Sequence, residues 1–190
     1  NELPANDMRM DYGVISHNGT GDEYGRVPAN QLNDNMFYSA LVSNIGADTQ
    51  TDVVVGVEVV DENNVEIVNT STTVDSVQRL EEYFYETEQS QELISGLYTT
   101  TFSVSSAEEM DGDLFDNNTV ERKFEITDDV YSLDAIDVDD ESILTSIGTG
   151  SFQGAADGFM VMLYYDLSME ENPVYGAEVL LASSTVPGGS

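Results

Sequence analysis

The sequence predicts an all-β protein, in which an Ig-like antiparallel β-sandwich is followed by a second β region of jelly-roll-like type. Apolar and polar residues alternate with a period of two along most of the chain, as in strands with one face in water. Turn signals such as Asn18-Gly19 and Asp111-Gly112 interrupt these runs. Hydrophobic residues make up 40% of the 190 residues, so the chain can bury a core despite its high charge. Short strands at regular spacing are typical of a sandwich.

The first expected strand begins near Met8. One face of it is formed by Met8, Met10, Tyr12 and Val14, which alternate with Arg9, Asp11 and Gly13. Another strand follows from the valines at every second position between Val53 and Val59, with Asp52 and Glu58 on the opposite face. Both segments contain the residue types that pleated sheets favour.

Two further strands are expected before residue 128. In one, Tyr98, Thr100, Phe102 and Val104 alternate with smaller hydroxyl residues. In the other, Val120, Arg122, Phe124 and Ile126 alternate with Glu121, Lys123 and Glu125. Each is expected to turn one face to a core and the other to water. Turns are expected at 44–46, 61–64 and 95–96.

Residues 77–93 allow two interpretations. Several apolar residues in this segment have the spacing of one helix face, and the segment contains Gln, Glu, Arg and Leu. The consecutive aromatic residues Tyr83, Phe84 and Tyr85 suit a strand better. We therefore predict a strand over Glu82–Glu88 that is followed by a loop.

We place a domain boundary after residue 128, so that residues 1–128 form the Ig-like sandwich and residues 129–190 form the second β region. Strands are expected there near 130–136, 158–167 and 175–182, and such a set makes only half a sandwich. The apolar face of these strands must therefore pack against another surface. Either it packs on the first domain, or the native chain continues past Ser190, or another subunit covers it. The ending Pro187-Gly188-Gly189-Ser190 resembles a linker and favours a longer polypeptide.

The charge balance is extreme. The chain has 5 Lys and Arg against 37 Asp and Glu, which gives a net charge of -32. It lacks the clustered cations that binding to nucleic acid or to an anionic membrane surface requires. A carboxylate-rich surface with few lysines is expected of a protein in high salt, where ions screen the self-repulsion. We therefore expect a saline, halophilic setting.

Residue counts exclude further classes. With no Cys and one His, the chain has no disulfide framework, no thiolate metal site and no multi-histidine centre of its own. The longest strongly apolar run, 159–165, is far shorter than the roughly 20 residues of a membrane-spanning helix. No signal peptide begins at Asn1, as expected of a mature product or of a fragment whose signal has been removed. We therefore expect an extracellular, secreted or cell-surface protein without membrane insertion.

Three segments resemble a known family. Residues 37–46, Phe-Tyr-Ser-Ala-Leu-Val-Ser-Asn-Ile-Gly, are similar to a strand that ends in a V-x-N-x-G turn. Gly96-Leu97-Tyr98 is similar to a G-x-Y strand entry, and residues 111–118 to an acidic turn that ends in Asn-Asn. On these segments the first domain resembles the CARDB-type, cell-adhesion-related Ig-like sandwiches of secreted bacterial and archaeal proteins. Residues 26–31 and 124–134 are similar to multidomain exported proteins of Bacteroidetes, in which an Ig-like module precedes a jelly-roll-like one.

The resemblance implies secreted or cell-surface scaffolding, adhesion or filament building, and no catalytic residues. The expected function is a non-enzymatic structural or adhesive module of a surface protein or filament. Its partners would be copies of itself, other surface proteins or glycans. The alternative is a carbohydrate-binding or spacer module of a larger secreted hydrolase. The lysine content common in such proteins is missing here, which fits a saline habitat.

The strongest candidate for a cofactor is Ca²⁺ at an acidic turn. Asp111, Asp113, Asp116 and Asn117, with Asn118 beside them, gather oxygen ligands in a Gly-containing loop, which suits this ion. The spacing is not that of an EF-hand. The alternative is a solvated turn in which the two Asn side chains bond to the backbone.

A second calcium candidate lies after the expected domain boundary. Asp137, Asp139, Asp140 and Glu141 could hold a cation at the junction and stiffen it. A solvated acidic loop is again the alternative, because carboxylates cluster by chance in so acidic a chain. No pair among the 37 carboxylates is selected for glycoside hydrolysis.

Two other features bear on binding. His17 adjoins the Asn18-Gly19 turn, where a single His is expected at the surface rather than as a base or ligand. Two aromatic runs, 83–85 and 164–165, offer platforms for a sugar or a partner. Because strand residues alternate between faces, one ring of each run is expected in the core.

Overall fold

The computed structural model describes residues 4–17, 23, 25–109, 115–133, 136–142, 165, 167 and 173–177. Within these residues the chain is a two-sheet β-sandwich without an α-helix, which confirms the predicted all-β, Ig-like fold class. The strands are β1 (Met8–Ser16), β2 (Arg26–Pro28), β3 (Asn35–Asn44), β4 (Gln50–Asp61), β5 (Glu66–Val77), β6 (Glu82–Ser90), β7 (Gly96–Ser105) and β8 (Thr119–Thr127). Two short 3-10 turns, η1 (Ala29–Gln31) and η2 (Phe115–Asn117), connect them.

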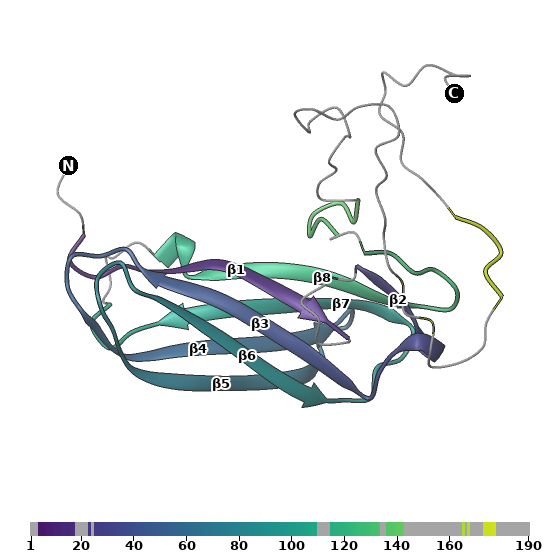
Figure 1. Cartoon of the computed structure of the whole chain (residues 1–190), viewed down its shortest axis with the longest axis horizontal. Helices are drawn as coiled ribbons and strands as arrows, with labels where there is room; N and C mark the ends of the chain where they lie inside the picture. The colour runs from purple at the N-terminus through teal and green to yellow at the C-terminus, as the bar shows by residue number, and fades with distance from the viewer. Residues whose placement is uncertain are drawn as a thin grey trace, which may run out of the picture.

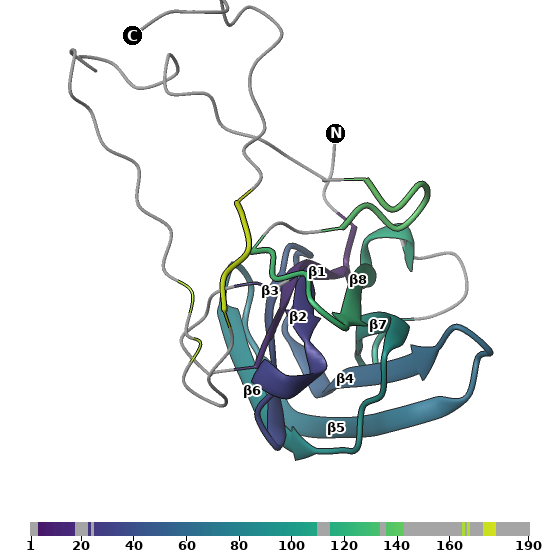
Figure 2. The ribbon, with the colours of Figure 1, turned by 90° about the vertical axis from the view of Figure 1, so that its right-hand side faces the viewer.

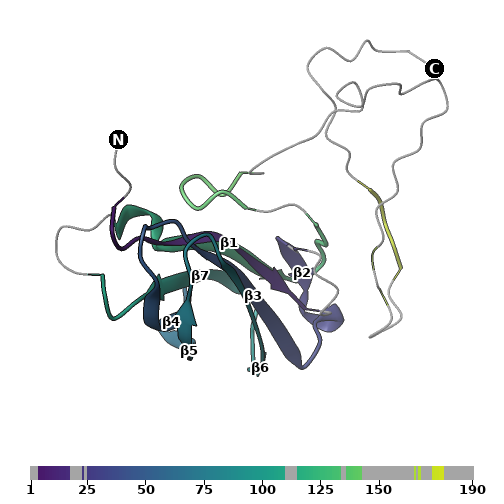
Figure 3. The ribbon, with the colours of Figure 1, turned by 60° about the vertical axis from the view of Figure 1, so that its left-hand side comes forward.

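The strands form two layers. Sheet A has the order β1-β3-β6, and sheet B has the order β2-β8-β7-β4-β5. All pairs are antiparallel except β2 with β8. Figures 1 and 2 show sheet A lying over sheet B, and β1 packs on β7 and β8. The strands β5 and β6 lie at the opposite side and form the lower edge of the ribbon in Figures 1 and 3.

The core fills the space between the sheets. The inward valines of β4 (Val53, Val55, Val57 and Val59) are at most 2% exposed, and the inward residues of β7 (Tyr98, Thr100, Phe102 and Val104) are also buried. The rings of Tyr98 and Phe124 stack with their centroids 5.1 Å apart. Because each large apolar side chain contributes about 1.5–3 kcal/mol on burial, these alternating faces are what holds the two sheets together. The predicted alternation in β4, β7 and β8 is confirmed.

The strand β1 departs from the predicted alternation. Its pairing with β3 shifts register between Met10 and Tyr12. A bulge of this kind adds one residue to a strand, so the inward positions after it are Gly13 and Ile15 rather than Tyr12 and Val14. Tyr12 is 39% exposed on the outer face. The prediction that Tyr12 and Val14 share the face of Met10 is therefore wrong.

Gly13 suits this inward position because Phe102 packs against its backbone. A Cβ atom on Gly13 would lie 2.1 Å from Cδ2 of Phe102, well inside the roughly 3.5–4.0 Å of ordinary carbon contact. Phe102 is fully buried in the middle of β7. The absence of a side chain at Gly13 lets β1 of sheet A approach β7 of sheet B.

Two predictions about the middle of the chain are confirmed. The turn expected at 61–64 joins β4 to β5, and the Asp61 carboxylate accepts the backbone N–H groups of Asn63 and Val65, each at 2.8 Å. The bond from Val65 is the main reason that the pKa of Asp61 lies below its usual value. The segment over residues 77–93 contains a strand, β6, rather than a helix.

The chain after β8 differs from the prediction. Among the described residues of the strand expected over 130–136, Ser132 and Ile136 form isolated bridges, to Arg26 and to Lys123. The hydroxyl of Thr127 explains the break, because it bonds to both the N–H and the C=O of Val130 and forms a turn. The described parts of 158–167 and 175–182 contain no strand, and the rest lies outside the described residues. The second β region and its boundary remain predictions.

Candidate interaction surface

An apolar row crosses the outer face of sheet A. Tyr12 of β1 pairs with Leu41 of β3, and Leu41 pairs with Phe84 of β6. Residues paired across neighbouring strands share a face, so these three side chains, called the apolar row below, form one line across the sheet. Phe84 is 53% exposed and Tyr12 is 39% exposed. Exposed apolar side chains gathered in this way indicate a contact surface.

Alternation and the β1 bulge together produce the apolar row. In the aromatic run of β6, Tyr83 and Tyr85 point inward and join or pack on the core, and Phe84 between them points outward. Alternation splits this run as expected, but it turns two rings inward rather than the one ring predicted. Without the bulge, Tyr12 would lie on the core side and the row would lack its β1 member.

Polar side chains border the apolar row on β3 and β6. The Ser39 hydroxyl donates to Oε2 of Glu86 at 3.0 Å, and the Asn35 amide donates to Oε1 of Glu88 at 2.5 Å. In each pair, the β6 carboxylate accepts the hydrogen bond that the β3 side chain donates. The face therefore has an apolar centre and a polar border, which is the usual anatomy of a protein–protein contact.

Two edge strands on the same side of the sandwich, β6 of sheet A and β5 of sheet B, differ in charge. Within the described residues, β5 pairs only with β4, and β6 pairs only with β3. The outward positions of β6 include Glu82, Glu86 and Glu88, whose charges oppose pairing with another strand. The β5 edge carries Ser and Thr through residues 70–73 and no Lys or Pro. High salt weakens the charge protection of β6 and of Glu66 and Asp75 in β5, and leaves the hydroxyl-rich stretch 70–73 unchanged.

His17 is buried, and the expectation of a surface position is wrong. Its side chain is 2% exposed, and Nε2 lies 2.6 Å from the Tyr131 hydroxyl. The Tyr131 ring also packs edge-on against Tyr165, at 5.1 Å between centroids. His17 thus attaches the end of β1 to the segment that follows β8. Tyr131 lies 114 residues away in sequence, so local pattern gives no sign of this contact.

The first calcium candidate is only partly described. Asp111 and Asp113 lie outside the described residues, and Asp116 is exposed on η2. The Asn117 amide donates to Oδ1 of Asp7 at 3.0 Å. Asn118 is buried and donates to the Val104 carbonyl at 3.1 Å and to the Glu109 carboxylate. The calcium prediction for this turn remains untested.

Two glutamates close the same end of the sandwich. Glu109 accepts the backbone N–H groups of Met8 at 2.7 Å and of Ser106 at 3.1 Å. Glu108 accepts the hydroxyl and the N–H of Thr51, and these bonds hold the pKa of Glu108 below its usual value. Both side chains satisfy backbone groups at strand ends, so their role here is structural.

The second calcium candidate forms a backbone turn. Asp137 accepts the N–H of Asp139 at 2.8 Å, and Asp140 accepts the N–H of Ser142 at 3.1 Å. Bonds from the hydroxyl and the N–H of Ser142 lower the pKa of Asp140. Glu141 lies 3.3 Å from the Lys123 ammonium. Across the described parts of the chain, no three His, Asp or Glu side chains are placed to hold a metal, and calcium at this loop stays a prediction.

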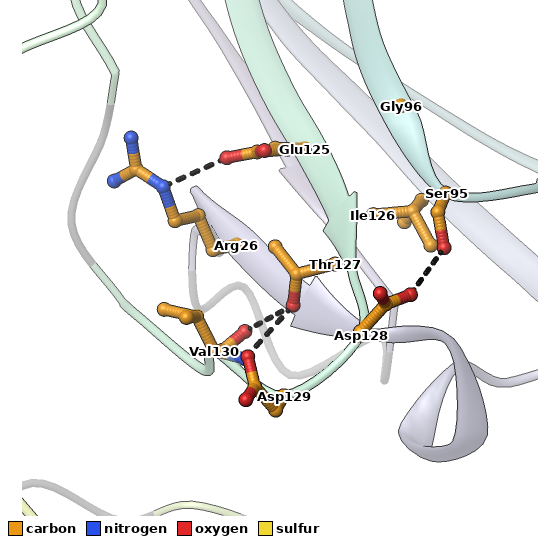
Figure 4. Close-up of a pocket in the computed structure, with 9 residues that line it drawn as sticks. All are labelled: Arg26, Ser95, Gly96, Glu125, Ile126, Thr127, Asp128, Asp129 and Val130. Atoms are coloured by element: carbon orange, nitrogen blue, oxygen red, sulfur yellow. Dashed lines mark hydrogen bonds and ion pairs between the residues drawn. The ribbon is translucent and has the colours of Figure 1, made fainter.

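A shallow groove lies where β2 and β7 begin and β8 ends (Figure 4). Arg26 pairs with Glu125 at 2.9 Å, and the Ser95 hydroxyl donates to Asp128 at 3.0 Å (Figure 4). A hydrolytic pair of carboxylates must instead face a reacting bond between them. The Arg26–Glu125 pair links β2 to β8, and the Ser95–Asp128 bond links the loop before β7 to the end of β8.

Within the described residues, no helix has the length and apolarity to cross a bilayer. No family model and no curated protein matches the sequence.

The fold is similar to that of solved β-sandwich domains. One is the crystal structure of a CARDB domain from Pyrococcus furiosus in complex with di-metal ions, at 16% identity and a TM-score of 0.45 over 67% of this chain and 93% of that chain. Another is the C-terminal domain of Wzt, at 16% identity and a TM-score of 0.47 over 77% of this chain and 87% of that chain. Both are similarities at low sequence identity, and the β-sandwich itself is established by the two sheets of this chain.

Proposed function

We propose that this chain is a non-enzymatic structural or adhesive module that works outside the cell by self-association through the apolar row. The observation that carries the proposal is the exposure of Tyr12 and Phe84 on one line of sheet A. A second copy of this chain is the proposed occupant. Two copies related by a two-fold axis place the same row against itself, with β3 near the axis.

The border of the row favours a protein surface over a sugar as occupant. Sugar recognition requires free donors and acceptors that point at hydroxyl groups. The donors of Ser39 and Asn35 are instead held by Glu86 and Glu88. Association with an apolar protein face requires no free donors at this border, because burial of the rings supplies the free energy of association.

Charge sets the conditions for assembly. Two copies that each carry a formal charge of -32 repel one another at low ionic strength. At molar salt the Debye length is about 3 Å, so the repulsion between facing carboxylates is screened. Salt also strengthens apolar association when its ions are excluded from the surface. The composition therefore supports a saline, extracellular place of work, in which the module assembles.

Sedimentation velocity across a series from 0.1 to 3 M KCl tests this function. We expect wild-type protein to be monomeric at low salt and to associate as salt rises. Phe84→Ser should remove the association, whereas Ile94→Ser should retain it, because Ile94 is 70% exposed on the loop before β7, away from the row. A wild-type chain that stays monomeric throughout, or a Phe84→Ser variant that still associates, would contradict the proposal.

A carbohydrate-binding or spacer module of a larger secreted hydrolase is the second candidate. The aromatic nature of Tyr12 and Phe84 favours it, since sugar rings stack on exposed aromatic faces. Binding to a panel of polysaccharides by affinity electrophoresis separates the two functions. Retardation by one polysaccharide that Phe84→Ser abolishes, with no self-association at any salt, would favour this second function.

A further inference from the structure

A group of buried oxygen acceptors lies at the end of the sandwich where η2 meets β1. Asp7 is 3% exposed and Asn118 is 5% exposed. The side-chain Oδ1 atoms of Asn117 and Asn118 are both buried and have no hydrogen-bond partner. A buried carbonyl oxygen without a partner has lost its hydrogen bonds to water without a replacement, and this destabilises the folded state. Two such atoms on adjacent residues therefore call for a ligand.

The hydrogen bonds of the two amide nitrogens fix the orientation of the Asn117 and Asn118 side chains. The Asn117 amide nitrogen donates to Oδ1 of Asp7 at 3.0 Å, and the Asn118 nitrogen donates to the Val104 carbonyl and to Glu109. These bonds fix which end of each amide is nitrogen, because a flipped amide would turn an oxygen toward a carboxylate. The orphaned oxygens thus belong to held side chains rather than to loose ones.

The carboxylate of Asp7 adds a buried charge without a cation. The structure gives this carboxylate one hydrogen bond, from Asn117. Among the described residues, the ion pairs of Arg9, Arg26, Arg122 and Lys123 all go to other carboxylates. A buried carboxylate that lacks a counter-charge is costly. The site therefore has an excess of acceptors and a negative charge, and a bound positive ion with a preference for oxygen ligands would satisfy both.

We propose that Asp7, Asn117 and Asn118 bind one Ca²⁺ ion, with water completing its coordination. Calcium takes carboxylate and amide oxygens together and tolerates irregular geometry, whereas Mg²⁺ demands near-octahedral order and keeps its water. The inference needs neither Asp111 nor Asp113, and it does not depend on the proposed self-association. Two of the three proposed protein ligands are amides, and Asp7 is the one carboxylate among them.

The site would join distant parts of the chain. Asp7 precedes β1, and Asn117 and Asn118 precede β8, so an ion held by all three fastens the two strands that close one side of the sandwich. Their separation of 110 residues means that the ion is bound by the folded chain and not by the unfolded one. Binding of that kind stabilises the fold in proportion to the logarithm of ion concentration.

Isothermal titration of chelator-treated full chain with CaCl₂ in 0.5 M KCl tests the proposal, because this salt suppresses diffuse binding to surface carboxylates. We expect one saturable site in wild-type protein. We also expect the Tm to rise by at least about 5 °C at 100 times Kd over its value in EDTA. An equal concentration of MgCl₂ should have a much smaller effect.

Asp7→Asn is the informative variant, and Asp48→Asn is its matched control, because Asp48 is exposed at the same end of the sandwich. Asp7→Asn keeps the shape but removes the buried charge, so its Tm in EDTA should exceed that of wild type while the calcium response is lost. Asp48→Asn should respond like wild type. If the titration of wild-type protein shows no saturable site, that result alone overturns the proposal. Retention of the wild-type Kd in Asp7→Asn would overturn it as well.

Discussion

Gly13→Ala tests the bulge in β1, which turns Tyr12 outward and completes the apolar row. The added Cβ would lie 2.1 Å from Cδ2 of Phe102 and 2.5 Å from Cε2 and Cγ. Phe102 is fully buried, so the ring can move only by displacing other core residues. Overpacking of this kind costs about 1–3 kcal/mol. For a sandwich of this size we therefore expect the Tm to fall by about 5–10 °C.

Thermal unfolding followed by circular dichroism measures this change, with Gly56→Ala as the control. A Cβ on Gly56 would lie 2.9 Å from the Ser103 hydroxyl, which can rotate away. Gly56→Ala should therefore stay within about 0.5 kcal/mol of wild type. Combining Gly13→Ala with Phe102→Leu should cost less than the sum of the two single changes, since the smaller side chain makes room for the methyl group. A Gly13→Ala variant as stable as wild type would refute the inward position of Gly13, and with it the outward position of Tyr12.

Three further predictions concern stability. Leu80 has a φ of 63° and is 73% exposed, so Leu80→Asn should raise stability by about 0.5–1 kcal/mol in urea unfolding, and a loss would contradict the assigned backbone. Asn44 is fully buried, and its side chain bonds to Asp48, Val77 and Gly46; Asn44→Ala should cost about 2–4 kcal/mol in the same assay, and a cost below about 1 kcal/mol would show that these bonds are dispensable. The pKa of Asp61 is lowered in the folded state, so its stabilisation is present above the unfolded pKa and is lost as pH falls through the folded pKa. Asp61→Asn should therefore be less stable than wild type at neutral pH and should approach it below about pH 4, and a constant difference across pH would contradict this assignment.

The fold was predictable where one face of a strand is apolar. The alternation in β4, β7 and β8 directly specifies inward valines and aromatic rings, and the run at 83–85 identifies β6. The strand β5 was missed because Ser and Thr occupy both of its faces through residues 70–73, and hydroxyl residues give no apolar period. The three-residue β2 is too short for any period to show.

The sites were less predictable because they depend on register and on distant contacts. Alternation alone indicates that Phe84 points away from Tyr83 and Tyr85, but its alignment with Tyr12 requires the register of two strand pairs and a bulge. His17 meets Tyr131 across 114 residues, and a period-two pattern does not report such contacts. The Asn-Asn end of the acidic turn was recognised as a source of oxygen ligands, but its partner Asp7 lies 110 residues earlier in the chain.

In the proposed assembly, two copies meet through the outer face of sheet A. The chain has no Cys, so a single introduced thiol reports contact between copies. Ser39→Cys places this thiol on β3 beside the apolar row, and Ser103→Cys places it on β7 of sheet B. Under mild oxidation in 3 M KCl, we expect disulfide-linked dimers from Ser39→Cys and few from Ser103→Cys. Equal yields from the two variants, or no dimer from Ser39→Cys, would contradict it.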